Sequence, residues 1–159
     1  MVAPFDATRT DPRRITWTRL LGDHERIAQQ CATIALLAQR EDRPAETVAI
    51  LLLELAVFVA DHLGVEDEVI DLTLAAVRTG SSPQDAVAMA RRLEVLKSDW
   101  GAFIVAWTPA ALATRWPEFA VAAEAMLPRL VAQVRGESEL LYAEALRRGV
   151  IDSGQPILH

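Results

Sequence analysis

The residues of this chain best suited to metal chemistry are a histidine and a glutamate four positions apart, His62 and Glu66. On a helix this spacing stacks an imidazole and a carboxylate on one face, one turn apart. A later segment runs in the same rhythm, but Gln133 stands in place of the histidine and Glu137 in place of the glutamate. The two segments indicate a two-fold repeat in which one half has kept its metal ligands and the other has lost its histidine.

A third candidate ligand, His24, has its counterpart in the second half at Trp100, which is also not a histidine. Two imidazoles and two carboxylates therefore remain as candidate ligands: His24, His62, Glu66 and Glu137. Such a set can hold one ion of zinc or iron, but hardly two. An open coordination position on that ion would allow a small molecule to bind.

Long amphipathic helices are expected to position these residues. Ala and Leu, which favour helix, dominate the composition, and no strand pattern competes with the helical one. The apolar stripes carry His24 on the first helix, His62 and Glu66 on the second, and Gln133 and Glu137 on the fourth. Short connections between long helices predict an all-α fold, an up-down-up-down antiparallel four-helix bundle. The expected helices cover residues 16–39, 45–78, 83–107 and 117–148.

The expected bundle is one domain, residues 16–149, since 159 residues can bury a single core. Residues 1–15 are rich in proline and charge and are expected to form an N-terminal arm. Residues 150–159 are too short to fold alone and are expected to form a C-terminal tail.

The composition excludes several classes of partner. A net charge of −6 argues against nucleic acid and against an anionic membrane surface. The most apolar run, Val48 to Ala60, is interrupted by Glu54 and is too short to cross a bilayer. No secretory signal is visible, and the single Cys31 excludes an internal disulfide, so we expect a cytoplasmic protein without a membrane partner.

Three segments resemble the hemerythrin-like (HHE cation-binding) domain family. They are Asp23-His24, the run His62–Asp67 and the run Glu137–Tyr142, and the resemblance extends from about residue 17 to residue 148. In that family a four-helix bundle holds two irons, and its members carry oxygen, sense oxygen or iron, or handle nitric oxide or peroxide. The resemblance implies that His24 and His62 bind the first iron and that Glu66 and Glu137 match the carboxylates that bridge the two irons.

The match fails on the second iron's side. Trp100 stands where the third helix would supply a histidine, and its indole is expected to occupy the vacated subsite. Gln133 stands where the fourth helix would supply one, and a neutral amide is a poor ligand for iron. The chain is therefore expected to be a divergent member with a degenerate di-iron site that binds at most one Fe or Zn ion, with Gln133 as a neighbour.

Two functions stay open at this point. One is a metal-dependent role in sensing, small-molecule binding or metal handling. The other is a metal-free pseudo-hemerythrin that serves as a ligand-binding or protein-interaction module. No catalytic triad, phosphate loop or paired-cysteine motif is present, so neither catalytic nor organic-cofactor residues are predicted. The high apolar content makes a homodimer through an exposed helix face a further expectation.

Overall fold

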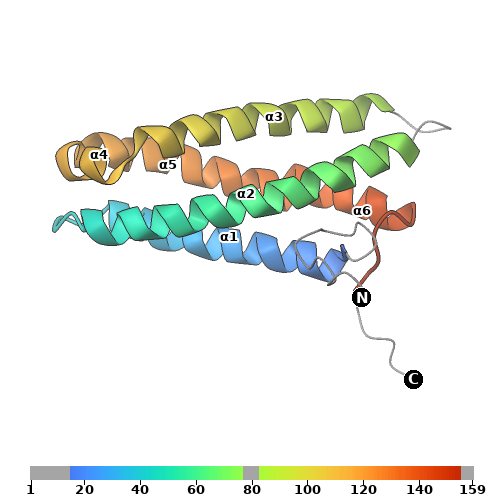
Figure 1. Ribbon diagram of the computed structural model, residues 1–159, viewed down its shortest axis with the longest axis horizontal. Coiled ribbons are helices and arrows are strands. Elements are labelled where there is room, and N and C mark those ends of the chain that lie inside the picture. The colour runs from blue at the N-terminus through green and yellow to red at the C-terminus, as the bar shows by residue number, and fades with distance from the viewer. Residues whose placement is uncertain (1–14, 77–82, 155–159) are drawn as a thin grey trace, which may run out of the picture.

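The computed structural model describes residues 15–76 and 83–154, and it is all-helical (Figure 1). The expected all-α class is confirmed. Within the described residues no strand occurs, only an isolated bridge between Thr16 and Asp152. The helices are α1 (Trp17–Ala38), α2 (Ala45–Ala76), α3 (Pro83–Ala106), α4 (Pro109–Thr114), α5 (Trp116–Gln133) and α6 (Glu139–Arg147), with a π-helical segment η3 (Val134–Ser138) between α5 and α6.

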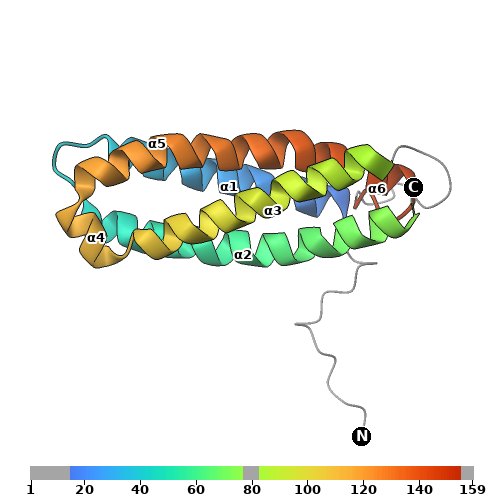
Figure 2. The ribbon, with the colours of Figure 1, turned by 90° about the horizontal axis from the view of Figure 1, so that it is seen from above.

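The long helices lie lengthwise beside one another (Figures 1 and 2). α5, η3 and α6 follow one another as a single continuous rod, and α3 runs obliquely across the other helices in the view of Figure 2. The fourth expected helix differs from its prediction at residues 134–138, where the π-helical turn interrupts the rod. A short α4 occupies the connection before this helix, started by Thr108, whose side chain accepts a hydrogen bond from the Ala111 amide.

Two hydrophobic clusters make up the core, and on α1 and α2 the candidate ligands fall between residues of the two clusters. In α1, His24 falls between Leu20 of the smaller cluster and Ile27 of the larger one. In α2, His62 falls between Val59 of the larger cluster and Val65 of the smaller one. The candidate ligands therefore lie inside the apolar core, where an unpaired polar group is costly.

α2 also carries an apolar outer face. Ile50, Leu53 and Val57 are exposed there, while the opposite side of the helix holds core residues and His62. By length and composition alone the stretch Ala45–Thr73, with a mean hydropathy of 2.1, could cross a membrane. Its apolar length exceeds the run expected from the sequence. Core helices of helical bundles meet the same criterion, so this feature is weak evidence for a membrane.

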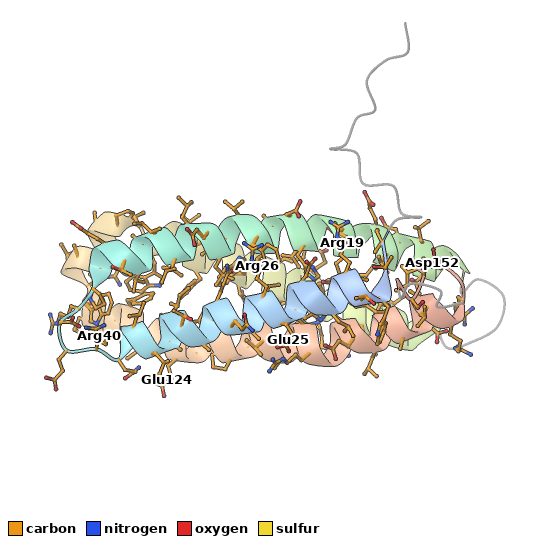
Figure 3. The ribbon with its side chains drawn as sticks, turned by 90° about the horizontal axis from the view of Figure 1, so that it is seen from below. Arg19, Glu25, Arg26, Arg40, Glu124 and Asp152 are labelled. Carbon is orange, nitrogen blue, oxygen red and sulfur yellow. The ribbon has the colours of Figure 1, made fainter. Side chains whose placement is uncertain are left out.

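Hydrogen bonds hold the two ends of the described chain together. The Trp17 amide donates to the Asp152 carbonyl at 2.7 Å, and the Thr18 amide donates to the Ser153 carbonyl at 3.1 Å. Figure 3 shows Asp152 beside the start of α1. Ile15 and Ile151 are both buried in the smaller cluster, so residues 150–154 of the expected tail pack against the helices. Residues 1–14 and 155–159 lie outside the described part.

Gly154 is expected to be essential to this junction. Its φ is +76°, and a Cβ atom there would lie 2.5 Å from the Thr16 Cβ. Gly149 is the matched control, because its φ of +73° is similar but a Cβ would meet open space. Gly149→Ala should cost only the left-handed backbone strain, about 1 kcal/mol, whereas Gly154→Ala should cost about 2 kcal/mol or more. Urea unfolding measures both, and equal losses would contradict the close contact at Gly154.

Candidate metal centre

Three side chains meet between residues of the two clusters: His24 from α1, and His62 and Glu66 from α2. Their exposed fractions are 1%, 1% and 0%, and one ligand atom from each lies within 4.8 Å of the others. His62 and Glu66 meet because they are one helical turn apart on the buried face of α2. His24 joins them because α1 packs along α2 with its own apolar stripe facing inward. These three residues lie close enough to hold a metal ion.

The distances within the cluster are those of ligand atoms around one point. The Nε2 atoms of His24 and His62 are 3.2 Å apart, and His62 Nε2 lies 3.1 Å from Glu66 Oε2. The hydroxyl oxygen of Tyr142, from α6, lies 3.3 Å from the first imidazole and 3.2 Å from the second. Metal–ligand bonds of about 2.0–2.1 Å place neighbouring ligand atoms about 2.9–3.4 Å apart in octahedral or tetrahedral geometry.

Carboxylates at the edge of the cluster orient both imidazoles. Asp23 Oδ2 lies 3.0 Å from His62 Nδ1, and Glu139 Oε1 lies 3.4 Å from His24 Nδ1. A proton held on each Nδ1 by these carboxylates leaves the Nε2 lone pair directed into the cluster. Metal-binding histidines in proteins are oriented by the same kind of partner.

Glu66 is positioned by one short hydrogen bond, from the Ser138 hydroxyl to its Oε1 at 2.5 Å. Its other oxygen, Oε2, is buried and lies 3.1 Å from His62 Nε2. A buried carboxylate is costly without a donor or a cation beside it, and either a protonated His62 or a metal ion at the centre of the cluster would satisfy it. The donor set therefore fits a metal ion.

In the metal-free cluster the two histidines differ in protonation, because their pKa values shift in opposite directions. Burial alone would lower the pKa of His62, but the carboxylates of Asp23 and Glu66 raise it to about 9. The pKa of His24 is lowered, first by burial and then by repulsion from His62. Burial alone would raise the pKa of Glu66, but His62, Ser138 and Tyr142 beside it lower that pKa overall. The metal-free cluster thus holds one imidazolium, on His62, and one carboxylate.

The remaining predicted site residues lie differently. Trp100 is buried in the larger cluster and stacks on Phe103 at 5.6 Å, and its described contacts do not include either histidine of the site. Gln133 is half-buried and lines a surface groove with Arg91 and Arg129. The side chain of Glu137 lies outside the described part of the structure, so its predicted role as a ligand stays a prediction.

The inward face of the fourth rod includes two residues that were not expected there. Val134 and Ser138 are buried, whereas Gln133, which was expected to point inward, is half-buried. A π-helical turn accommodates one more residue than an α-helical turn, and such turns are frequent at functional sites. The turn at 134–138 lies immediately before Tyr142 and includes Ser138, so it sets which side chains reach the cluster.

Sequence reasoning did not assign roles to four residues of the site: Asp23, Ser138, Glu139 and Tyr142. All four lie in the segments that carry the family resemblance, but spacing alone does not show that Asp23 on α1 contacts a histidine on α2. Ser138 and Tyr142 are four residues apart, which places both on one helical face. This four-residue spacing is the feature of the sequence from which their shared position on one helical face could have been predicted.

Fold and site together define an all-helical protein with a buried cluster of two histidines and one carboxylate. Comparisons of the chain with models of protein families, with curated proteins and with solved structures found no match. The function of this protein must therefore be inferred from its residues and their geometry.

The stability of the metal-free protein should fall as pH rises from 6.5 to 9. The folded pKa of His62, about 9, lies above its ordinary value of 6.5, so its proton stabilises the fold fully below pH 6.5 and is lost through pH 9. His24 is neutral throughout that window. The expected loss in free energy of unfolding is about 3 kcal/mol.

Denaturant unfolding of chelator-treated protein at several pH values measures this loss. Asp23→Asn is the informative variant, because it removes a carboxylate that holds the proton on His62 and should flatten the dependence. A flat profile in the parent protein would show that His62 is neutral in the fold.

Proposed function

We propose that this protein binds one metal ion, iron or zinc, in the core of a hemerythrin-like four-helix bundle. His24, His62 and Glu66 would hold the ion. The observation that carries this proposal is the buried cluster itself, in which His62 Nε2 lies 3.2 Å from His24 Nε2 and 3.1 Å from Glu66 Oε2. Two histidines and one carboxylate with open positions are a known ligand set for non-haem iron(II), and similar sets bind zinc.

Several features support the hemerythrin-like bundle as the fold. The rods α1, α2, α3 and α5–η3–α6 lie lengthwise beside one another (Figure 1). The buried candidate ligands come from two neighbouring helices, α1 and α2, as ligands do in metal-binding bundles. The segments around His24, His62 and the π-helical turn are those that carry the family resemblance. Membership of that family is our proposal from these residues.

One ion, and not two, agrees with the surroundings of the cluster. Leu96, Trp100, Leu130 and Val134, the residues at and near the second-iron positions, are all buried members of the larger hydrophobic cluster. Apolar side chains supply no ligand atoms. Gln133 lines the surface groove and is not among the described residues that contact the cluster.

The proposed role is reversible binding or sensing of a small molecule at the ion, or handling of the ion itself. Three protein ligands leave positions that a small molecule can occupy, and a buried polar site strengthens such binding because water is excluded. Asp23 and Glu139 connect the histidines to the surface, since their side chains are 21% and 35% exposed. They can pass protons between solvent and the imidazoles. We expect such a protein in the cytoplasm.

A metal-free interaction module is the second candidate, and two observations favour it. The proton on His62 offsets the charge of Glu66 without any ion. An apolar groove of about 540 Å³ between α1 and α5, lined by residues such as Ala28, Cys31 and Leu127, could take an apolar ligand. The exposed row Ile50, Leu53 and Val57 could serve a homodimer, which light scattering would detect.

Metal binding by Glu66→Gln and Glu54→Gln distinguishes these functions. Both variants neutralise a carboxylate on α2, but Glu66 is buried in the cluster and Glu54 is exposed. Calorimetric titration of chelator-treated protein with zinc and with iron(II) should give one equivalent bound. Glu66→Gln should lose affinity by about tenfold or more, and Glu54→Gln should match the parent protein.

Thermal stability gives a second readout of the same binding. An ion at one hundred times its dissociation constant should stabilise the fold by about 2.7 kcal/mol. Absence of binding in the parent protein for both metals would overturn the proposal and leave the metal-free module. Two equivalents at similar affinity would contradict the single site.

A further inference from the structure

Tyr142 is the least expected member of the cluster. It is the chain's single tyrosine and is fully buried. Its ring stacks on the His24 imidazole with centroids 5.2 Å apart, and its hydroxyl lies within 3.3 Å of the Nε2 atoms of both histidines. The residue therefore presents an oxygen to the same point as the three proposed ligands.

Hydrogen bonding alone explains this position incompletely. Without an ion the hydroxyl can accept a hydrogen bond from protonated His62, but its one proton can go to only one of the two remaining acceptors, His24 Nε2 and the carboxylate of Glu66. A phenylalanine ring would pack equally well in the smaller hydrophobic cluster, to which Tyr142 belongs. Burial and the neighbouring carboxylates raise the pKa of Tyr142, so without an ion the side chain stays a neutral phenol.

The acidic groups around the cluster favour a highly charged ion. Glu66 supplies one negative charge inside, and Asp23 and Glu139 supply two more at the edge, within 3.4 Å of the imidazoles. A phenolate would add a fourth. A divalent ion leaves two of these charges uncompensated, whereas a trivalent ion leaves one, and the difference matters in a site of low polarity.

We infer that Tyr142 is the fourth ligand of the proposed site and that it makes the site a binder of iron(III). The inference depends on the proposed metal function. Phenolate oxygen is an established ligand of iron in proteins, and imidazole and carboxylate complete a set of two nitrogens and two oxygens. On binding, the phenol O–H bond of Tyr142 and the Nε2–H bond of the His62 imidazolium are replaced by bonds to iron, and two protons per ion are released to solvent. No electron is transferred when the ion is supplied as iron(III).

An iron(III)–phenolate bond can be detected without any activity assay. The full-length chelator-treated protein would receive one equivalent of iron(III) as its citrate complex, and a charge-transfer band in the visible range is expected. Zinc should give no such band, because it has a filled d shell. Resonance Raman spectra excited in the band should show phenolate modes that shift when the protein is made with ring-deuterated tyrosine. With a single tyrosine, that shift can come only from Tyr142.

Tyr142→Phe and Ser138→Ala form a matched pair. Each removes one buried hydroxyl from the cluster, but the Ser138 hydroxyl contacts Glu66 and neither histidine. Tyr142→Phe should abolish the band and weaken iron(III) binding by about tenfold or more, while changing zinc binding less. Ser138→Ala should also lower the affinity for iron(III), because Ser138 positions Glu66, but it should keep the band. The labelled parent protein gives the result even if a variant does not fold.

The outcomes separate the inference from the proposed function. A visible band with tyrosine-sensitive Raman modes supports the inference. Iron or zinc bound by His24, His62 and Glu66 without such a band overturns it and leaves the proposed function standing. Failure to bind any of the metals overturns both.

Discussion

The Nε2 atoms of His24 and His62 lie 3.2 Å apart inside the core, and the arrangement of the surrounding residues depends on this contact. Two imidazole lone pairs directed at one point repel one another unless a proton or a cation lies between them. Burial removes the water that would otherwise relieve this repulsion. Each neighbour of the pair addresses the same electrostatic problem: Asp23 and Glu139 behind the rings, Glu66 beside them and Tyr142 above them.

The cost of burying these polar groups is offset by the two hydrophobic clusters. The larger cluster packs Leu, Ile, Val, Trp and Phe side chains from all six α-helices and from η3, and Ile15 and Ile151 complete the smaller cluster. The junction of residues 15–18 with residues 151–154 closes the end of the bundle near the site. Solvent is excluded from both sides of the cluster, which strengthens every charge interaction inside it.

The π-helical turn shows how a local irregularity serves such a site. Residues 134–138 leave the α-helical hydrogen-bond pattern directly opposite the buried carboxylate of Glu66, where Ser138 donates to it. The turn thus contains the hydroxyl residue that binds the carboxylate. Trp100 and Val134, at and beside the positions expected for the second iron's histidines, are buried in the larger cluster and contribute packing.

The sequence by itself determined the helical class, most helix boundaries and the inward position of His24, His62 and Glu66. Apolar spacings of three and four are a direct consequence of helical periodicity, and His62 and Glu66 meet through local geometry alone. The tertiary structure decided the partners from other helices. Asp23 reaches a histidine on α2, and Tyr142 reaches both histidines, because of how the helices are rotated and offset against one another. Packing also placed Val134 and Ser138 on the inward face of the fourth rod. The sequence could not predict this placement, since spacings of three and four both fit the apolar pattern and a π-helical turn has no periodic signal.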